Sequence, residues 1–346
     1  MKTDNSFLQP VTKACSFLIL ALLMNATPSL AYQQLQQQSE IRYIDRSKGE
    51  RNIARPIDID LPAGNSTRGA DQSSNGTLLW RIEHTKNHAD IRSSYIFGTM
   101  HIDDQRVMNI PDSMLHRVIA ADVLMLELEL NDNNSVDMLR KMLFTDGRNL
   151  SQVIGKQGFK NVSDALLESG NSLPIDVLTV LKPWAAMLLL IKPENKSGTF
   201  LDKKLATLAR SAGVRVQGLE TVNEQLSVFD DIEIEDQVSL LLSTMSTLDD
   251  KERAYQQMLD AYLTGNLSEL VKISDSQLPE DQRLADMVNS KLITERNQLM
   301  FNRMQYQLQA GNAFIAIGAL HLAGNEGLLE KLREAGYRLT RVRASE

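Results

Sequence analysis

The sequence predicts an α/β fold in which a central, largely parallel β-sheet is flanked by helices. Short and almost wholly apolar runs, typical of buried strands, alternate with longer segments whose apolar residues recur every three or four positions. Helical periodicity also fills most of residues 135–211 and 222–304, which are too long to be simple crossovers between strands. We therefore expect a large helical insertion that caps the sheet or adds a second layer to it.

The first 31 residues have the pattern of a secretory signal peptide. Lys2 and Lys13 make the start basic, and residues 14–24 form an apolar core that is too short to span a membrane. Ser29 and Ala31 supply the small residues of a cleavage site. We expect residues 1–31 to be removed, which predicts a periplasmic or secreted protein. An uncleaved membrane anchor is the alternative interpretation.

Residues 32–77 differ in composition from everything that follows. They are rich in Gln, Ser, Asn and Gly and bury little apolar surface, which predicts a flexible linker. Within this linker, residues 55–62 could add one edge strand. The single cysteine of the chain, Cys15, lies in the predicted signal peptide, so stability after cleavage must come from an apolar core. A net charge of −7 without a basic stripe argues against a nucleic-acid partner, and no later apolar run is long enough to span a membrane.

The folded domain is predicted to extend from residue 78 to 346, without a split into independent halves. Residues 78–84 and 93–101 are apolar runs joined by a polar stretch, which predicts a β-hairpin. Residues 110–121 have helical periodicity, with Pro111 near the first turn. The remaining predicted elements outside the helical stretches are strands at 123–130, 214–220, 313–321 and 337–342, and a helix at 326–336 that ends at a glycine.

Four of the predicted strands end in a histidine or a carboxylate. His101 and His321 follow two of them, and Glu220 follows a third. Ligands of open α/β sheets bind beyond the carboxyl ends of the strands, so these side chains converge if the strands are parallel and adjacent. The fourth strand carries Glu127 and Glu129, which alternate, so only one of them faces the site.

The two histidine segments share the pattern G-x-x-H at the end of an apolar run, with Gly98 and Gly318 three residues before the imidazoles. Glycine at this position allows the backbone to leave the strand tightly and a neighbour to approach closely. Two imidazoles with one or two carboxylates suit Zn, Mn, Fe or Co, with one position open for water. Metal-bound water is acidic enough to supply hydroxide near neutral pH.

Each of these residues also has a structural interpretation. A histidine at a strand end can simply be hydrogen-bonded, and Glu220 could stabilise the N-terminus of the helix that follows it. His84 and His88 are four residues apart, but they flank the predicted hairpin turn instead of lying on a helix, so we do not expect them to bind metal. The sequence contains no phosphate-binding glycine-rich loop, no nucleophile elbow and no H-E-x-x-H motif.

Six segments resemble the TraB/GumN family, which is similar to the Tiki metalloproteases and, more distantly, to the erythromycin-esterase and ChaN-like proteins. The resemblance covers roughly residues 78–343, and two G-x-x-H motifs with an E-L-[DE]-L strand between them make it specific. The segments are FGTMHIDDQRVMNIPDS, VLMLELEL, LKPW, GLETVNEQL, ERN at 295–297, and AIGALHLAGNEGLLEKLREAGYRLTRV.

The resemblance implies an α/β fold of the erythromycin-esterase/ChaN-like type and a metal site. His101 and His321 match the motif histidines, Glu127 matches the first glutamate of the E-L-[DE]-L strand, and Glu220 matches the glutamate of the family's G-L-E. All four are thereby implied as metal ligands, with Glu127 as a ligand or general base and Glu220 as a ligand or a partner of one.

Arg296 and Asn297 match an R-N pair that would orient the substrate or steady a developing oxyanion. A buried ion pair that holds its helix in place is the alternative for Arg296.

We therefore predict an exported metal-dependent hydrolase, a peptidase first of all, that acts on a peptide or small-molecule substrate and uses Mn, Co, Zn or Fe. The main alternative is a non-catalytic periplasmic protein that sequesters a peptide or a haem-like ligand. A third possibility is a metal-free hydrolase in which His101 is the general base.

Overall fold

The computed structural model describes residues 77–85, 91–129, 134–171, 173–192 and 199–343. The predicted signal peptide, the linker up to residue 76 with its possible edge strand at 55–62, and His88 lie outside the described residues. No helix in the described part is both long enough and apolar enough to cross a membrane.

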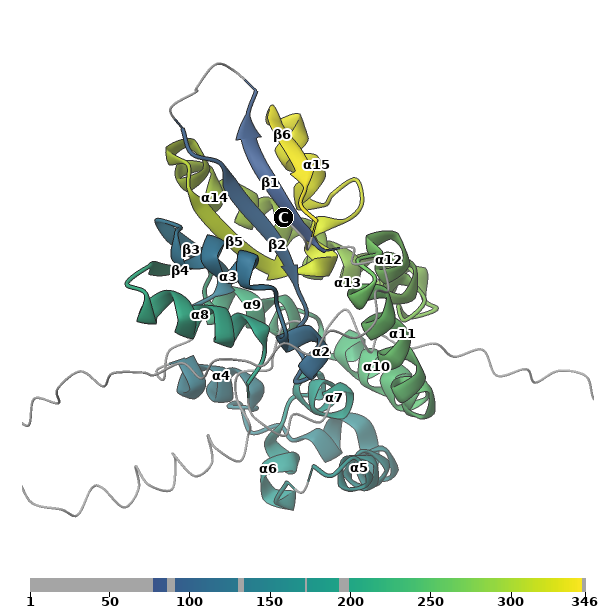
Figure 1. Cartoon of the computed structure of the whole chain (residues 1–346). Helices are drawn as coiled ribbons and strands as arrows, with labels where there is room; N and C mark the ends of the chain where they lie inside the picture. Colours follow the sequence, from purple (N-terminus) through teal and green to yellow (C-terminus); the bar gives the residue numbers. More distant parts are fainter. Residues whose placement is uncertain (1–76, 86–90, 130–133, 172, 193–198, 344–346) are drawn as a thin grey trace, which may run out of the picture.

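A mixed sheet of six strands forms the centre of the fold, in the order β4-β3-β5-β2-β1-β6 (Figure 1). The strands β4, β3, β5 and β2 run parallel to one another, while β1 is antiparallel to both β2 and β6. The predicted hairpin and the largely parallel sheet are therefore confirmed. The strands are β1 (Leu79–His84), β2 (Ser94–Thr99), β3 (Val123–Leu128), β4 (Arg215–Glu220), β5 (Ala313–Gly318) and β6 (Tyr337–Arg341).

The register of the sheet brings the ends of the parallel strands to one edge. Thr99 at the end of β2 pairs with Gly318 at the end of β5, and Leu128 at the end of β3 pairs with Glu220 at the end of β4. Every residue of β3 and β5 is buried, as expected for central strands that are covered on both faces. The convergence that the sequence predicted for parallel, adjacent strands is thus met by the backbone.

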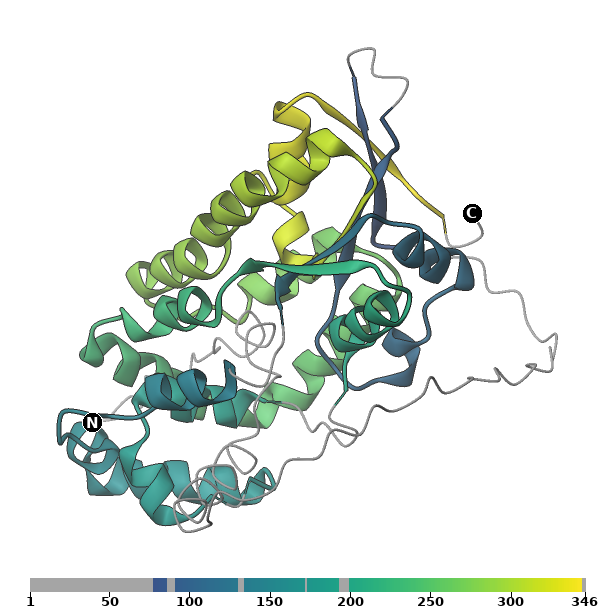
Figure 2. The same ribbon diagram turned by 90° about the vertical axis from the view of Figure 1, so that its left-hand side faces the viewer.

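Helices cover both faces of the sheet (Figures 1 and 2). Helices α3 (Asp112–Ile119) and α8 (Leu201–Ser211) pack together on one face, and α14 (Glu295–Ala310) and α15 (Leu328–Glu334) lie on the other. Because crossovers between parallel strands are right-handed, the chain covers one face as it moves from β2 through β3 to β4 and the other face as it returns to β5. The neighbours β3 and β5 therefore flank the point where the direction of winding reverses, which is where open α/β sheets bind ligands.

The helical middle of the chain builds a second apolar core. This core contains Trp184 and its neighbours in α7 (Pro183–Ile191), Phe229 of α9 (Val222–Asp230) and Leu241 of α10 (Ile234–Met245). It reaches the sheet through Leu128. Leu320, between β5 and the helical lobe, packs against both cores. Figure 1 shows this lobe beyond the ends of the parallel strands, so the predicted insertion covers the edge where the polar residues converge.

The bounds of the helices in chain order complete the fold. They are α2 (Gln105–Met108), α3 (Asp112–Ile119), α4 (Asn134–Met142), α5 (Leu150–Glu168), α6 (Ile175–Val180), α7 (Pro183–Ile191), α8 (Leu201–Ser211), α9 (Val222–Asp230), α10 (Ile234–Met245), η3 (Leu248–Asp250), α11 (Lys251–Leu263), α12 (Leu267–Asp275), α13 (Gln282–Asn289), the π-helical η4 (Ser290–Thr294), α14 (Glu295–Ala310), the 3₁₀ turn η5 (Ala319–Leu322) and α15 (Leu328–Glu334).

Three strands end at least two residues before the predicted position. The strand predicted at 93–101 ends at Thr99. The strand predicted to reach residue 321 ends at Gly318, and the residues after it form η5. The reason lies in the neighbouring strand: a Cβ atom on Gly98 would lie 2.9 Å from Leu322 and 3.1 Å from the backbone of Ala319. Glycine at position 98 therefore lets η5 fold back across β2, which periodicity could not predict. The strand predicted at 123–130 ends at Leu128.

Candidate functional site

The six residues predicted for the site all come to the carboxyl edge of the sheet or to the helix that faces it. Glu127 and Glu220 lie in β3 and β4, His321 lies in η5, and His101 follows β2. Arg296 and Asn297 lie in the first turn of α14. Each of the six side chains is buried: exposures are 9% for His101, 3% for Glu127, 5% for Glu220, 4% for Arg296, 0% for Asn297 and 1% for His321. Polar groups at this depth must be satisfied by one another or by a ligand.

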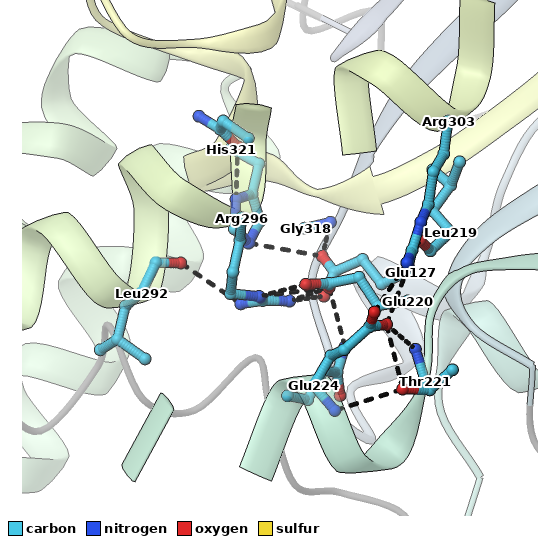
Figure 3. A network of polar contacts seen from close by, with 12 residues as sticks. Glu127, Leu219, Glu220, Thr221, Glu224, Leu292, Arg296, Arg303, Gly318 and His321 are labelled. Carbon is cyan, nitrogen blue, oxygen red and sulfur yellow. Dashed lines mark hydrogen bonds and ion pairs between the residues drawn. The ribbon is translucent and has the colours of Figure 1, made fainter. Parts of the chain in front are cut away.

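Arg296 is the cation of this cluster, and two carboxylates share it (Figure 3). Its Nη2 atom donates to Glu127 Oε2 at 2.9 Å and to Glu220 Oε2 at 2.7 Å, and its Nε donates to Glu220 Oε1 at 3.0 Å. The buried ion pair considered as an alternative role for Arg296 is therefore present. Two carboxylates against one guanidinium leave the cluster with a net charge of −1.

A wide helical turn precedes Arg296. The π-helix η4 leads directly into α14, and the Arg296 Nη1 atom donates to the carbonyl oxygen of Leu292 within it at 3.3 Å. Single π turns are rare and occur frequently at functional sites, because they re-aim one side chain of an otherwise regular helix. Here the irregular turn accompanies the guanidinium that joins β3 to β4.

Glu127 links the arginine to the histidine after β5. Its Oε1 atom accepts a hydrogen bond from the Gly318 backbone N–H at 2.6 Å and lies 3.8 Å from His321 Nε2. Burial opposes ionisation of this carboxyl, but the positive charges of His321, Arg296 and His101 and the Gly318 N–H together lower its pKa to about 2. His321 itself is neutral at neutral pH, so Arg296 and the Gly318 amide are what keep Glu127 ionised there.

Asn297 fixes the orientation and tautomer of His321. The Asn297 Nδ2 atom donates to the Glu326 carbonyl oxygen at 2.8 Å, so Oδ1 is the atom that lies 2.7 Å from His321 Nδ1. Nδ1 therefore carries the proton and donates, and Nε2 presents a lone pair toward Glu127. Burial first, and then the charge of Arg296, lower the pKa of His321 to about 3, so the imidazole is neutral at neutral pH.

Replacing Asn297 with leucine tests this arrangement. We expect the free energy of unfolding to fall by about 1–3 kcal/mol, because His321 Nδ1 and the Glu326 carbonyl lose a buried partner. Nitrogen NMR of labelled histidine should show His321 as the Nδ1-protonated tautomer in the wild type and as a mixture in the variant. Gln298→Ala, at the next and exposed position, should change stability by less than about 0.5 kcal/mol. An unchanged tautomer in Asn297→Leu would contradict the role given to Asn297.

Asp202 is a site residue that sequence reasoning missed. Its Oδ2 atom lies 3.0 Å from His101 Nε2, and its Oδ1 accepts from the Thr99 hydroxyl at 3.1 Å. The residue lies in the first turn of α8, inside the long helical stretch where no strand end marked it. A usable signal existed: Asp202 occupies the buried stripe of α8 together with Leu205, Ala206 and Ala209, a position where an acidic residue needs a reason.

The contacts of Glu129, Glu220 and His84 decide between the alternative roles considered for these residues. Glu129 is exposed and lies 3.4 Å from Arg210, so the alternation that directs only Glu127 into the site is confirmed. The Thr221 hydroxyl caps α9 in a capping box with Glu224, while Glu220 accepts from Gln225 of the same helix and from Arg296. The His84 ring contacts Tyr337, and its Nε2 lies 3.0 Å from the Leu308 carbonyl oxygen, away from this site.

The donor atoms of the site suit a divalent metal in type, although they form pairs. No group of three or more His, Cys, Asp or Glu residues in the described ranges comes together as a ready coordination shell. Instead, His321 faces Glu127 and His101 faces Asp202. A neutral imidazole, an ionised carboxylate, and the buried Asp202 Oδ2, which makes no hydrogen bond to the described residues, are the ligand types that Zn, Mn, Fe and Co take.

The fold and the site define an α/β protein with a buried histidine, carboxylate and arginine cluster at the point where the winding of its sheet reverses. The chain belongs to the TraB/PrgY/gumN family, whose model matches residues 78–341. The family that the sequence motifs predicted is thereby confirmed.

The chain is also similar to curated metalloproteases at low identity. It is 24% identical to Metalloprotease TIKI2 of Danio rerio over 79% of this chain and 63% of that protein. It is 23% identical to Metalloprotease TIKI1 of Homo sapiens over 77% of this chain and 62% of that protein. The chain thus spans less than two thirds of the length of these two relatives. No solved structure matches the chain significantly.

Proposed function

We propose that the protein is an exported metal-dependent hydrolase that cleaves peptides. The observation that carries this proposal is the buried cluster of net charge −1 whose Glu127 oxygen faces the His321 Nε2 lone pair at 3.8 Å. Burying an excess negative charge is costly unless a cation compensates it, and an imidazole lone pair beside a carboxylate is a place for such a cation. The two relatives at low identity are metalloproteases by name, which supports the same reaction class.

In this proposal His101, His321 and Glu127 hold the divalent metal, which is Mn, Co, Zn or Fe. When bound, the metal supplies an acidic water and polarises the substrate carbonyl. Glu127 serves as a ligand or as the general base that accepts the proton of the water. We assign Glu220 to hold Arg296 in place, since its oxygens already accept from Arg296 and from Gln225.

Arg296 and Asn297 are proposed to act through the residues they contact. Arg296 keeps Glu127 ionised, and Asn297 keeps the His321 Nε2 lone pair directed toward Glu127. A fixed orientation of this kind is what hydrogen-bonded partners supply to metal-binding imidazoles. These contacts favour a positioning role for both residues over the oxyanion contact expected from the family resemblance. The erythromycin-esterase/ChaN-like type of the fold also remains part of the proposal.

Metal content tests the proposal directly. Mass spectrometry of the purified protein should find near-stoichiometric divalent metal, and the His101→Ala/His321→Ala double variant should lose it while keeping its circular dichroism spectrum. His84→Ala, whose ring lies outside the site, is the matched control and should retain the metal. A peptide-library screen with Mn, Co and Zn would then identify the substrate.

Two other outcomes of this experiment would contradict the proposal. Absence of metal even after reconstitution, with hydrolysis that persists in chelator, would indicate a metal-free hydrolase that uses His101 as its base. Stoichiometric ligand binding without turnover would indicate a sequestering protein, and a haem absorption band lost in His101→Ala would identify a haem-like ligand.

Secretion with loss of residues 1–31, measured as the mass of the mature chain, tests the proposed export.

A further inference from the structure

We infer that Asp202 is a further metal ligand of this site and that it acts beside His101. This inference rests on the proposed function and adds to it a residue from α8, on the face of the sheet opposite α14. The site then consists of two imidazole and carboxylate pairs, His101 with Asp202 and His321 with Glu127, in which each G-x-x-H histidine faces one acid.

The first argument is the placement of Asp202. Its exposure is only 5%, and the hydroxyl of Thr99 holds Oδ1 at 3.1 Å. Thr99 is the last residue of β2 and lies two positions before His101. The same strand end therefore supplies both the imidazole and the hydroxyl that orients the acid next to it. This is the arrangement in which an outer hydrogen bond fixes a ligating carboxylate.

The second argument is the state of the other oxygen. Asp202 Oδ2 is buried and makes no hydrogen bond to any described residue. His101 Nε2 lies 3.0 Å away, but this contact does not have the geometry of a hydrogen bond. The nearby hydroxyl of Tyr262 donates to the Gly98 carbonyl oxygen instead. A buried carboxylate oxygen without a hydrogen bond destabilises the fold, and a bound metal ion would supply the partner that this oxygen lacks.

The third argument is the spacing of the two atoms. Ligand distances of about 2.0–2.2 Å place two neighbouring donor atoms of one metal roughly 3 Å apart. The separation of 3.0 Å between His101 Nε2 and Asp202 Oδ2 matches this spacing. Gly98 allows η5, which carries His321, to pack against β2 just before His101, so both pairs belong to one edge.

Metal titration separates this inference from the proposed function. The metal-stripped full chain is titrated with Mn²⁺ and with Zn²⁺ by calorimetry, and the visible spectrum of the Co²⁺ form reports the coordination. We expect Asp202→Asn to weaken metal binding by at least about 100-fold and to change the Co²⁺ spectrum, because an amide is a far poorer ligand. Asp230→Asn, which removes a partly buried carboxylate paired with Lys182, should leave both readouts unchanged.

A second pair of variants keeps the test decisive if Asp202→Asn does not fold. Thr99→Val removes the orienting hydroxyl and should weaken metal binding about 10–100-fold, while Thr99→Ser retains the hydroxyl and should restore it. Wild-type affinity in Asp202→Asn, or equal affinity in Thr99→Val and Thr99→Ser, would overturn the role of Asp202 and leave the proposed function standing. Failure of the wild type to bind any of the three metals would overturn both.

Discussion

Replacing Arg296 with leucine is expected to lower the free energy of unfolding by about 3–5 kcal/mol. The substitution leaves Glu127 and Glu220 buried without their shared cation, and removing one partner of a buried ion pair costs far more than the pair contributed. Urea unfolding followed by circular dichroism measures the change. Arg303→Leu removes an arginine from the same helix whose partner Glu224 is partly exposed, and should cost about 1 kcal/mol or less.

The same variant should reverse the pH dependence contributed by Glu127. In the wild type its pKa of about 2 lies below the ordinary value of 4.5, so its stabilisation is full above pH 4.5 and is lost as the pH falls through 2. Without Arg296, burial dominates and the pKa of Glu127 rises above 4.5, so the carboxyl destabilises the fold at neutral pH. Acidification should then narrow the gap in stability between wild type and variant. A gap that is small and independent of pH would contradict the ion-pair role of Arg296.

Replacing Glu127 with glutamine is expected to lower the hydrolytic rate about 10²–10⁴-fold, the range that a positioned acid or base contributes. The fold should survive, because Arg296 remains paired with Glu220 and the amide still offers one acceptor oxygen to Gly318 or Arg296. The rate is measured at saturating metal on the peptide that the library screen identifies. Metal content then separates the two roles: retained metal with a lost rate indicates a general base, whereas lost metal indicates a ligand.

Glu220→Gln is the matched control for this prediction. It makes the same amide substitution in the same cluster, but Glu220 does not face His321, so we expect a rate loss below about tenfold. Equal losses in Glu127→Gln and Glu220→Gln would mean that the position of Arg296, and no separate chemistry of Glu127, sets the rate.

Much of the backbone could be predicted from the sequence because its signals are local. The apolar runs of β3 and β5 are buried on both faces, and such runs can be recognised as strands without knowing which strands they pair with. The hairpin of β1 and β2 and the glycine that ends α15 are also local, and Gly336 adopts a φ of +88°, which favours glycine after a helix. The end of β5 was misplaced because a close approach from another strand sets it.

Local sequence reasoning could predict site residues only where they end strands, whereas Arg296 and Asn297 in α14 were predicted through the family resemblance. His101, Glu127, Glu220 and His321 follow or finish parallel strands, and parallel strands bring their carboxyl ends to one edge by geometry alone. Asp202 enters from a helix on one face, and no rule of strand ends could find it. The partner of each acidic residue could not be predicted either, because a contact between side chains depends on their positions in space and not on their spacing in the sequence.

Sequence patterns alone were enough to predict the family, the strand and helix order, and the polar residues at the ends of the parallel strands. The partner of each buried charge and of each imidazole became known from the three-dimensional arrangement. In the folded chain Glu127 and Glu220 both accept from Arg296. Asn297 sets the tautomer of His321, and Asp202 lies 3.0 Å from His101. The physical reason is that local patterns fix backbone periodicity, whereas charge compensation in a buried site depends on distances of a few ångströms between elements far apart in the chain.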